Sequence, residues 1–129
     1  MAKAELVEEE FDPAVLELRR GSPQVTGGLL RIRAKAYSDG KYPAKVKVLT
    51  ALDISVVIRC EPCIRMYVQK AIDLGVSKEE IIEFLEVAMA MQGCPGEAWA
   101  LKTLQIYDEL SQGLNITSTS KKEEACCPE

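Results

Sequence analysis

The chain has 129 residues, 47% of them hydrophobic, and a formal net charge of −4. This length and composition predict one domain with one core, and the mixed-sign, mildly acidic charge offers no basic surface to nucleic acid. The sequence shows no secretory leader and no apolar run of about 18 uncharged residues, so we expect a cytoplasmic protein with no membrane contact.

Helix start and stop signals follow one another along the first part of the chain. Asp12-Pro13 and Ser22-Pro23 each combine an N-cap residue with a proline in the first turn. The first of these helices can stop at Gly21 and the second at the turn-rich Ser38-Asp39-Gly40. Pro43 then begins a third helix, which is the most apolar and should therefore be central and buried.

The third helix should end near Cys60, because of the proline that follows. Pro62 has no N–H, and its ring would clash with the carbonyl of Ile58, so a continuous helix would be kinked or strained here. We prefer a new helix whose first turn holds Cys60 to Cys63 and which stops at Gly75.

Two more helices complete the predicted fold. Ser77-Lys78-Glu79-Glu80 is a capping box that starts the fifth helix, Gly93-Cys94-Pro95-Gly96 breaks it, and the sixth helix reaches Leu110. The residues expected at core spacing on the fifth helix are Ile81, Ile82, Leu85, Ala88, Met89 and Met91. About six helices and no strand predict an all-α fold, with one domain over residues 1–115 and a polar tail over 116–129.

The segment from Cys60 to Cys63 carries the most specific chemistry in a chain that has five cysteines and no histidine. A helix N-terminus and the neighbouring Arg59 both favour the thiolate, so Cys60 is the candidate nucleophile. Cys63 lies one turn deeper and is the candidate resolving thiol. Glu61 adds negative charge beside the pair and opposes part of this effect.

Two other interpretations of the pair stay open. Both cysteines can be buried packing residues, or they can contribute to a zinc site, which needs two further ligands. Cys94 is one such candidate, while Cys126 and Cys127 lie on the expected tail, so we predict neither a metal nor a cofactor.

Ordered motifs around the pair resemble the carboxymuconolactone decarboxylase and alkyl hydroperoxidase D-like family, over about Pro43 to Leu110. The motifs are Lys45-Val46-Lys47-Val48-Leu49-Thr50-Ala51-Leu52, Arg59-Cys60-Glu61-Pro62-Cys63-Ile64, Leu74-Gly75-Val76-Ser77-Lys78-Glu79-Glu80-Ile81 and Met91-Gln92-Gly93-Cys94-Pro95. The resemblance implies an alkyl hydroperoxidase D-like helical fold, assembly into trimers or hexamers, and redox work by the cysteine pair near subunit contacts.

The resemblance also implies a proton relay that this chain lacks. Redox-active members have a glutamate about a dozen residues before the first cysteine and a histidine shortly after the second, and these positions match Val48 and Tyr67. Tyr67 can donate a hydrogen bond, yet a phenol is by its reference acidity a poor base, and a core aromatic is the simpler interpretation. Peroxidase activity of the familiar kind is therefore in doubt.

Several other residues are candidate auxiliaries. Asp53, two turns before Cys60 on roughly the same face, would have a raised pKa if buried, although a solvated or ion-paired aspartate is the simpler interpretation. Glu97 would lie in the first turn of the last helix, where an acid stabilises the dipole regardless of function. Cys94 fits a packing thiol better than a third redox partner. Cys126 and Cys127 can reduce the central pair, bridge subunits, bind a soft metal or have no role.

These observations predict a small helical thiol–disulfide oxidoreductase that acts on a protein disulfide or a hydroperoxide. Its partners would be a disulfide-bearing protein or electron donor and further copies of the chain. Decarboxylation is less supported, because without histidine the chain lacks the commonest base. The competing hypothesis is a non-enzymatic helical oligomer that uses its cysteines for packing, redox sensing or partner binding.

Overall fold

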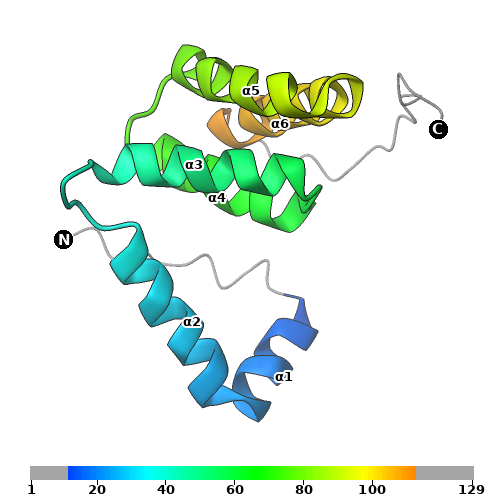
Figure 1. Cartoon of the computed structure of the whole chain (residues 1–129). Coiled ribbons are helices and arrows are strands. Elements are labelled where there is room, and N and C mark those ends of the chain that lie inside the picture. The colour runs from blue at the N-terminus through cyan, green and yellow to red at the C-terminus, as the bar shows by residue number, and fades with distance from the viewer. Residues whose placement is uncertain (1–11, 113–129) are drawn as a thin grey trace. The chain divides into compact units, whose positions relative to one another are not determined.

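The computed structural model describes residues 12–112, which form helices joined by short turns (Figure 1). The helices are α1 (Pro13–Gly21), α2 (Pro23–Ala36), α3 (Ala44–Val57), α4 (Glu61–Asp73), α5 (Lys78–Gln92) and α6 (Cys94–Ser111). No strand occurs in this part of the chain, so the all-α prediction with six helices is confirmed. The helices fall into two units, and the boundary between them along the chain lies between Ser38 and Asp39. The prediction of a single domain over 1–115 stays a prediction.

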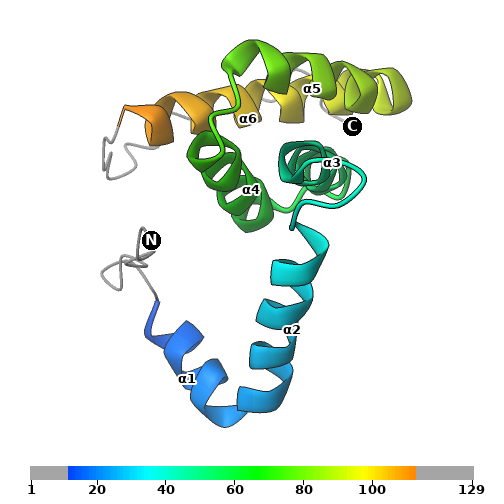
Figure 2. The ribbon, with the colours of Figure 1, turned by 90° about the vertical axis from the view of Figure 1, so that its left-hand side faces the viewer.

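The second unit contains α3 to α6 and holds the core. Figures 1 and 2 show two layers, with α3 beside α4 in one and α5 beside α6 in the other. Contacts join α3 to α5 and α4 to α6 across the layers. The largest fully buried side chains all belong to this unit: Val48, Leu49, Leu52, Val56, Ile64, Val68, Ile81, Leu85, Thr103 and Ile106. The apolar third helix is thus central, as its composition predicts.

Local signals fix the ends of α5 and its close packing with α6. The Ser77 hydroxyl accepts the Glu80 N–H, and the Glu80 carboxylate accepts the Ser77 N–H, so the predicted capping box is confirmed. Gly96 lies against α5, where an added Cβ would come within 3.0 Å of the Ala88 carbonyl oxygen. A side chain at position 96 would therefore push the two helices apart.

The first unit is a pair of helices that bury no side chain among the described residues. The Asp12 carboxylate caps α1 by accepting the Ala14 N–H at 2.9 Å, and proline occupies the first turn of both helices, as predicted. The large apolar residues of this pair that stay exposed are Leu16, Leu18, Val25, Leu29, Leu30 and Ile32. Two short helices cannot enclose a core, so these side chains have no cover within the unit.

Two sequence predictions about α5 and α6 need correction. Gly93 alone separates the helices, and Cys94, Pro95 and Gly96 belong to the first turn of α6, where proline is tolerated. On α5, Met91 is 81% exposed and Ile82 is also exposed, although both lie at core spacing. Only Ile81, Leu85 and Ala88 of α5 are buried, so the buried face of this helix is narrower than the spacing of its apolar residues predicts. No described helix is long and apolar enough to cross a membrane.

Candidate functional site

A tight turn between α3 and α4 sets the position of the cysteine pair. Arg59 has a φ of 57°, in the left-handed region, and the Cys60 N–H donates to the Ser55 carbonyl at 3.0 Å while the Arg59 N–H donates to Val56 at 3.1 Å. This is a Schellman-type helix ending with a non-glycine residue in the left-handed position. The turn ends α3 at Val57 and lets α4 start immediately after Cys60.

Relieving the backbone strain at Arg59 is expected to stabilise the protein. An L-residue in the left-handed region costs about 1–2 kcal/mol, whereas glycine pays about 0.5–1 kcal/mol in unfolded-state entropy. Arg59→Gly should therefore raise the free energy of unfolding by about 0.5–1 kcal/mol, and Arg59→Val should lower it by about 1–2 kcal/mol. Urea denaturation of the two variants checks this. Equal destabilisation by both would contradict the role of the backbone angle.

Cys60 and Cys63 are joined by a disulfide, with their Cα atoms 5.2 Å apart. Cys60 is the N-cap residue of α4, Pro62 lies in its first turn, and Cys63 follows on the same turn. The prediction of a new helix starting at the pair is confirmed. This arrangement brings the two predicted redox cysteines together at a helix N-terminus.

Once the disulfide is reduced, the same geometry favours a thiolate on Cys60. An N-cap side chain normally accepts an N–H from the second or third helical residue, and Pro62 has none, which leaves the Cys63 N–H as the donor. The positive end of the helix dipole acts in the same direction. The local environment is therefore suited to the charged sulfur that reacts with disulfides.

The negative charge of Glu61 is largely neutralised within the structure. Its carboxylate lies 2.9 Å from Lys102 Nζ on α6 and 3.4 Å from Arg65 on its own helix. The hydrogen bond from Lys102 is the main cause that lowers the pKa of Glu61, with smaller contributions from the charges of Lys102 and Arg65. The opposing effect of Glu61 on the thiolate is consequently weaker than the sequence alone indicates.

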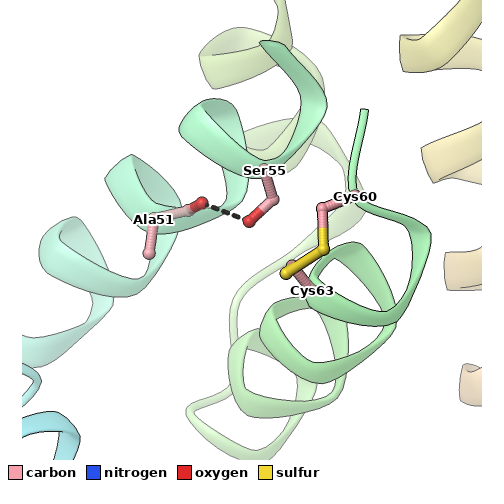
Figure 3. The surroundings of a disulfide bond; sticks show 4 residues. All are labelled: Ala51, Ser55, Cys60 and Cys63. Carbon is pink, nitrogen blue, oxygen red and sulfur yellow. Dashed lines mark hydrogen bonds between the residues drawn. A yellow bond between two sulfur atoms is a disulfide. The ribbon is translucent and has the colours of Figure 1, made fainter. Parts of the chain in front are cut away.

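A residue that the sequence analysis did not single out lies beside the pair. Ser55 is buried on α3, and Figure 3 shows its side chain on the face of that helix that looks toward the disulfide. Its hydroxyl donates to the Ala51 carbonyl at 2.7 Å. A hydroxyl in the apolar run from Ile54 to Ile58 was the available signal.

The two positions that would carry the proton relay are both buried. Val48 lies on α3 in the core, and Tyr67 lies on α4, one turn after Cys63, with Lys70 Nζ 6.0 Å from its ring centroid. The structure thus puts an aliphatic group and a phenol at the two positions where the resemblance implies a carboxylate and an imidazole.

Asp53 belongs to a different environment from the disulfide. It lines a hollow of about 370 Å³ between α3 and α5, and no other lining residue is charged. The residues with it are Thr50, Ile54, Val57, Phe84, Val87, Ala88 and Met91. The expected shared face with Cys60 does not arise, because α3 ends at Val57 and the chain turns at Arg59.

Burial raises the pKa of Asp53 from 3.8 to about 6, and its Oδ1 atom is buried without a hydrogen bond. The folded state therefore holds the proton more tightly than the unfolded state, so the contribution of this group is most favourable below pH 3.8 and is lost as pH rises through about 6. Asp53→Asn should raise the free energy of unfolding by about 1 kcal/mol at pH 7.5, a value discounted for partial exposure, and by much less at pH 4. Urea titrations at the two pH values test this; a gain independent of pH would contradict it.

The remaining candidates lie apart from the pair or outside the described residues. Cys94 and Glu97 line a second apolar hollow, of about 300 Å³ between α5 and α6, together with residues such as Leu101. Cys94 is exposed and takes part in a disulfide, so its interpretation as a buried packing thiol is wrong. Glu97 is in the first turn of α6, as predicted. Cys126 and Cys127 lie outside the described residues. Within residues 12–112, no group of three or more histidine, cysteine or acidic side chains is placed to hold a metal ion.

A family model and two solved structures point to the same protein family. The family model described as "Carboxymuconolactone decarboxylase family" matches residues 23–105, a span that begins earlier than the Pro43 start of the sequence resemblance. A solved carboxymuconolactone decarboxylase family protein from Legionella pneumophila aligns with a TM-score of 0.74 and 28% identity, over 77% of this chain and 88% of that one.

Two further relatives are similar over most of their length. A family member from Thermotoga maritima, for which an involvement in antioxidative response has been suggested, aligns with a TM-score of 0.62 and 30% identity, over 68% of this chain and 91% of that one. An uncharacterised protein of Cupriavidus necator is 29% identical over 94 residues, which are 73% of this chain and 83% of the relative.

Proposed function

Because this chain belongs to the carboxymuconolactone decarboxylase family, we propose that it is a thiol–disulfide oxidoreductase whose working groups are Cys60 and Cys63. The observation that carries the proposal is the disulfide that joins the two cysteines at the N-terminus of α4. The suggested link of the Thermotoga maritima relative to antioxidative response is in line with this class. Decarboxylation is less supported, since the chain contains no histidine to act as base.

In the reductive direction, the Cys60 thiolate attacks a substrate disulfide and forms a mixed disulfide while one substrate sulfur leaves as a thiolate. Cys63 then attacks Cys60, which releases the second substrate sulfur and closes the Cys60–Cys63 disulfide. Two electrons pass from the pair to the substrate. A dithiol reductant returns the pair to the reduced state.

The residues near the pair favour disulfides over hydroperoxides as substrates. A thiolate leaves without being protonated, whereas the alkoxide formed from a hydroperoxide needs a proton, a contribution of about 10²- to 10⁴-fold in rate. Val48 and Tyr67, both buried, supply neither the carboxylate nor the imidazole that the family resemblance implies for this proton transfer. A protein or small-molecule disulfide is therefore the substrate class that this site serves best.

The reduction potential of the pair tests the proposal. The wild-type protein is equilibrated in thiol redox buffers, free thiols are alkylated, and the tryptic peptide Cys60–Arg65 is followed by mass spectrometry. We expect a reversible two-electron midpoint between roughly −300 and −120 mV, absent from Cys63→Ser. A pair that stays reduced or unreactive throughout would overturn the oxidoreductase.

The alternative is a helical oligomer without enzymatic activity, favoured by the aliphatic and phenolic side chains at positions 48 and 67. Thiol reactivity separates the two functions. In an oxidoreductase, Cys60 should be alkylated selectively and fast near neutral pH, and the protein should turn over with a dithiol. In a scaffold, the cysteines should be alkylated slowly and without selectivity.

Assembly into a homo-oligomer is the second part of the proposal. Large apolar side chains stay exposed on α1 and α2, and Ile54, Val87 and Met91 are exposed around the hollow that holds Asp53. Large apolar side chains that stay exposed in number commonly mark an interaction site. Size-exclusion chromatography with light scattering should give three or six times the chain mass. A monomer at micromolar concentration would rule assembly out.

A further inference from the structure

Ser55 is linked to the cysteine pair at two points. Its carbonyl accepts the Cys60 N–H at 3.0 Å, and its side chain, 3% exposed as a residue, lies beside the disulfide on the facing helix (Figure 3). The first link holds Ser55 and Cys60 in one rigid turn. The hydroxyl is therefore kept at the pair whatever the redox state of the sulfurs.

The hydroxyl also has an acceptor that it can leave at little cost. It donates to the Ala51 carbonyl at 2.7 Å, and in a helix that carbonyl already accepts the N–H of residue 55. The carbonyl would stay paired if the hydroxyl rotated away. An O–H group turns about one bond, so the change needs no movement of the backbone.

Reduction of the pair changes which acceptor is the better one. The disulfide sulfurs carry no charge, whereas the reduced pair places a thiolate on a half-buried cysteine beside the buried Ser55. Hydrogen bonds to ionised acceptors are roughly twice as strong as those between neutral groups. The Ser55 hydroxyl therefore forms a stronger hydrogen bond with a neighbouring thiolate than with a carbonyl that already accepts a backbone N–H.

We infer that Ser55 is a redox-dependent hydrogen-bond donor, which bonds Ala51 when the pair is oxidised and the thiolate of the pair when it is reduced. The inference rests on the proposed oxidoreductase function and names a further residue of that site. In the reductive step, an external dithiol transfers two electrons, the Cys60–Cys63 bond breaks, and the dithiol becomes a disulfide. One of its two protons goes to Cys63 and the other to solvent, while Ser55 keeps its own proton and only redirects it.

Ser55→Ala and Ser55→Thr test the inference, with Thr50→Ala as the matched control. Thr50 makes the same kind of bond on the same helix, from its hydroxyl to the Val46 carbonyl at 2.8 Å, but it lines the hollow of Asp53. The pH dependence of alkylation of the reduced pair gives the thiol pKa, and redox buffers give the midpoint. Ser55→Ala should raise the thiol pKa by about one unit and lower the midpoint by about 30 mV, which is a tenfold change in equilibrium constant. Ser55→Thr and Thr50→Ala should both stay near wild type.

Equal thiol pKa values in Ser55→Ala and Thr50→Ala would overturn the role of Ser55. If Ser55→Ala does not fold, the variants Ser55→Thr and Ser55→Val, which have the same shape and differ by one hydroxyl, carry the comparison. Failure of the proposed function gives a different result, because the wild-type pair would then show no reversible midpoint while its thiol pKa could still be compared with that of the Ser55 variants.

Discussion

Replacing Cys60 with serine is expected to abolish disulfide turnover, with a fall in rate of roughly 10³-fold or more, because the hydroxyl of serine is not ionised at neutral pH. Cys63→Ser should behave differently. It keeps the first attack and loses the second, so the mixed disulfide with the substrate should accumulate. The measurement is reduction of a small aromatic disulfide with a dithiol as the electron source, together with the intact mass of the trapped protein.

The matched control for this pair of variants is Cys94→Ser. Cys94 takes part in a disulfide separate from the one that joins Cys60 and Cys63, and it lines the hollow between α5 and α6. Turnover should therefore persist near the wild-type rate in this variant. Equal loss of activity in all three variants, or a mixed disulfide that forms on Cys63 of the Cys60→Ser variant, would contradict the assignment of Cys60 as the attacking group.

The largest expected change in stability comes from Ile64, the first residue after the pair. It is 0% exposed and follows Cys63 directly on α4. Truncation of a fully buried isoleucine to alanine removes burial and leaves a cavity, at a cost of about 2–5 kcal/mol. Ile64→Ala should lower the free energy of unfolding by that amount in urea denaturation.

Ile58 offers a control of the same residue type on the other side of the pair. It is 61% exposed at the end of α3. Ile58→Ala should change the free energy of unfolding by no more than about 0.5 kcal/mol. Similar losses for both variants would show that residue 58 is covered in solution, as it would be if a second copy of the chain packed against this surface.

Much of the fold follows from local signals that act over a few residues. Helices begin where a side chain caps a backbone N–H, as at Asp12 and Ser77, or where a proline fits only the first turn, as at Pro62. The helix α4 ends just before Gly75, which has a positive φ. The same local reasoning identifies the cysteine pair at a helix start. The family resemblance also predicts the class of fold, which the structure confirms. It does not predict which residues take the place of the missing proton relay.

Other features depended on how the helices pack. The sequence spacing put Asp53 near Cys60, yet the left-handed turn at Arg59 directs α4 elsewhere and leaves the carboxyl in a separate hollow with a raised pKa. Ser55 and the neutralisation of Glu61 by Lys102 were likewise hidden, because both contacts join different helices. Where the helices begin and end, and that two cysteines lie at a helix start, can be predicted from the sequence, since these features depend on neighbours along the chain. Which polar groups lie beside those cysteines is known only once the helices are packed, because it depends on the directions in which separate helices cross.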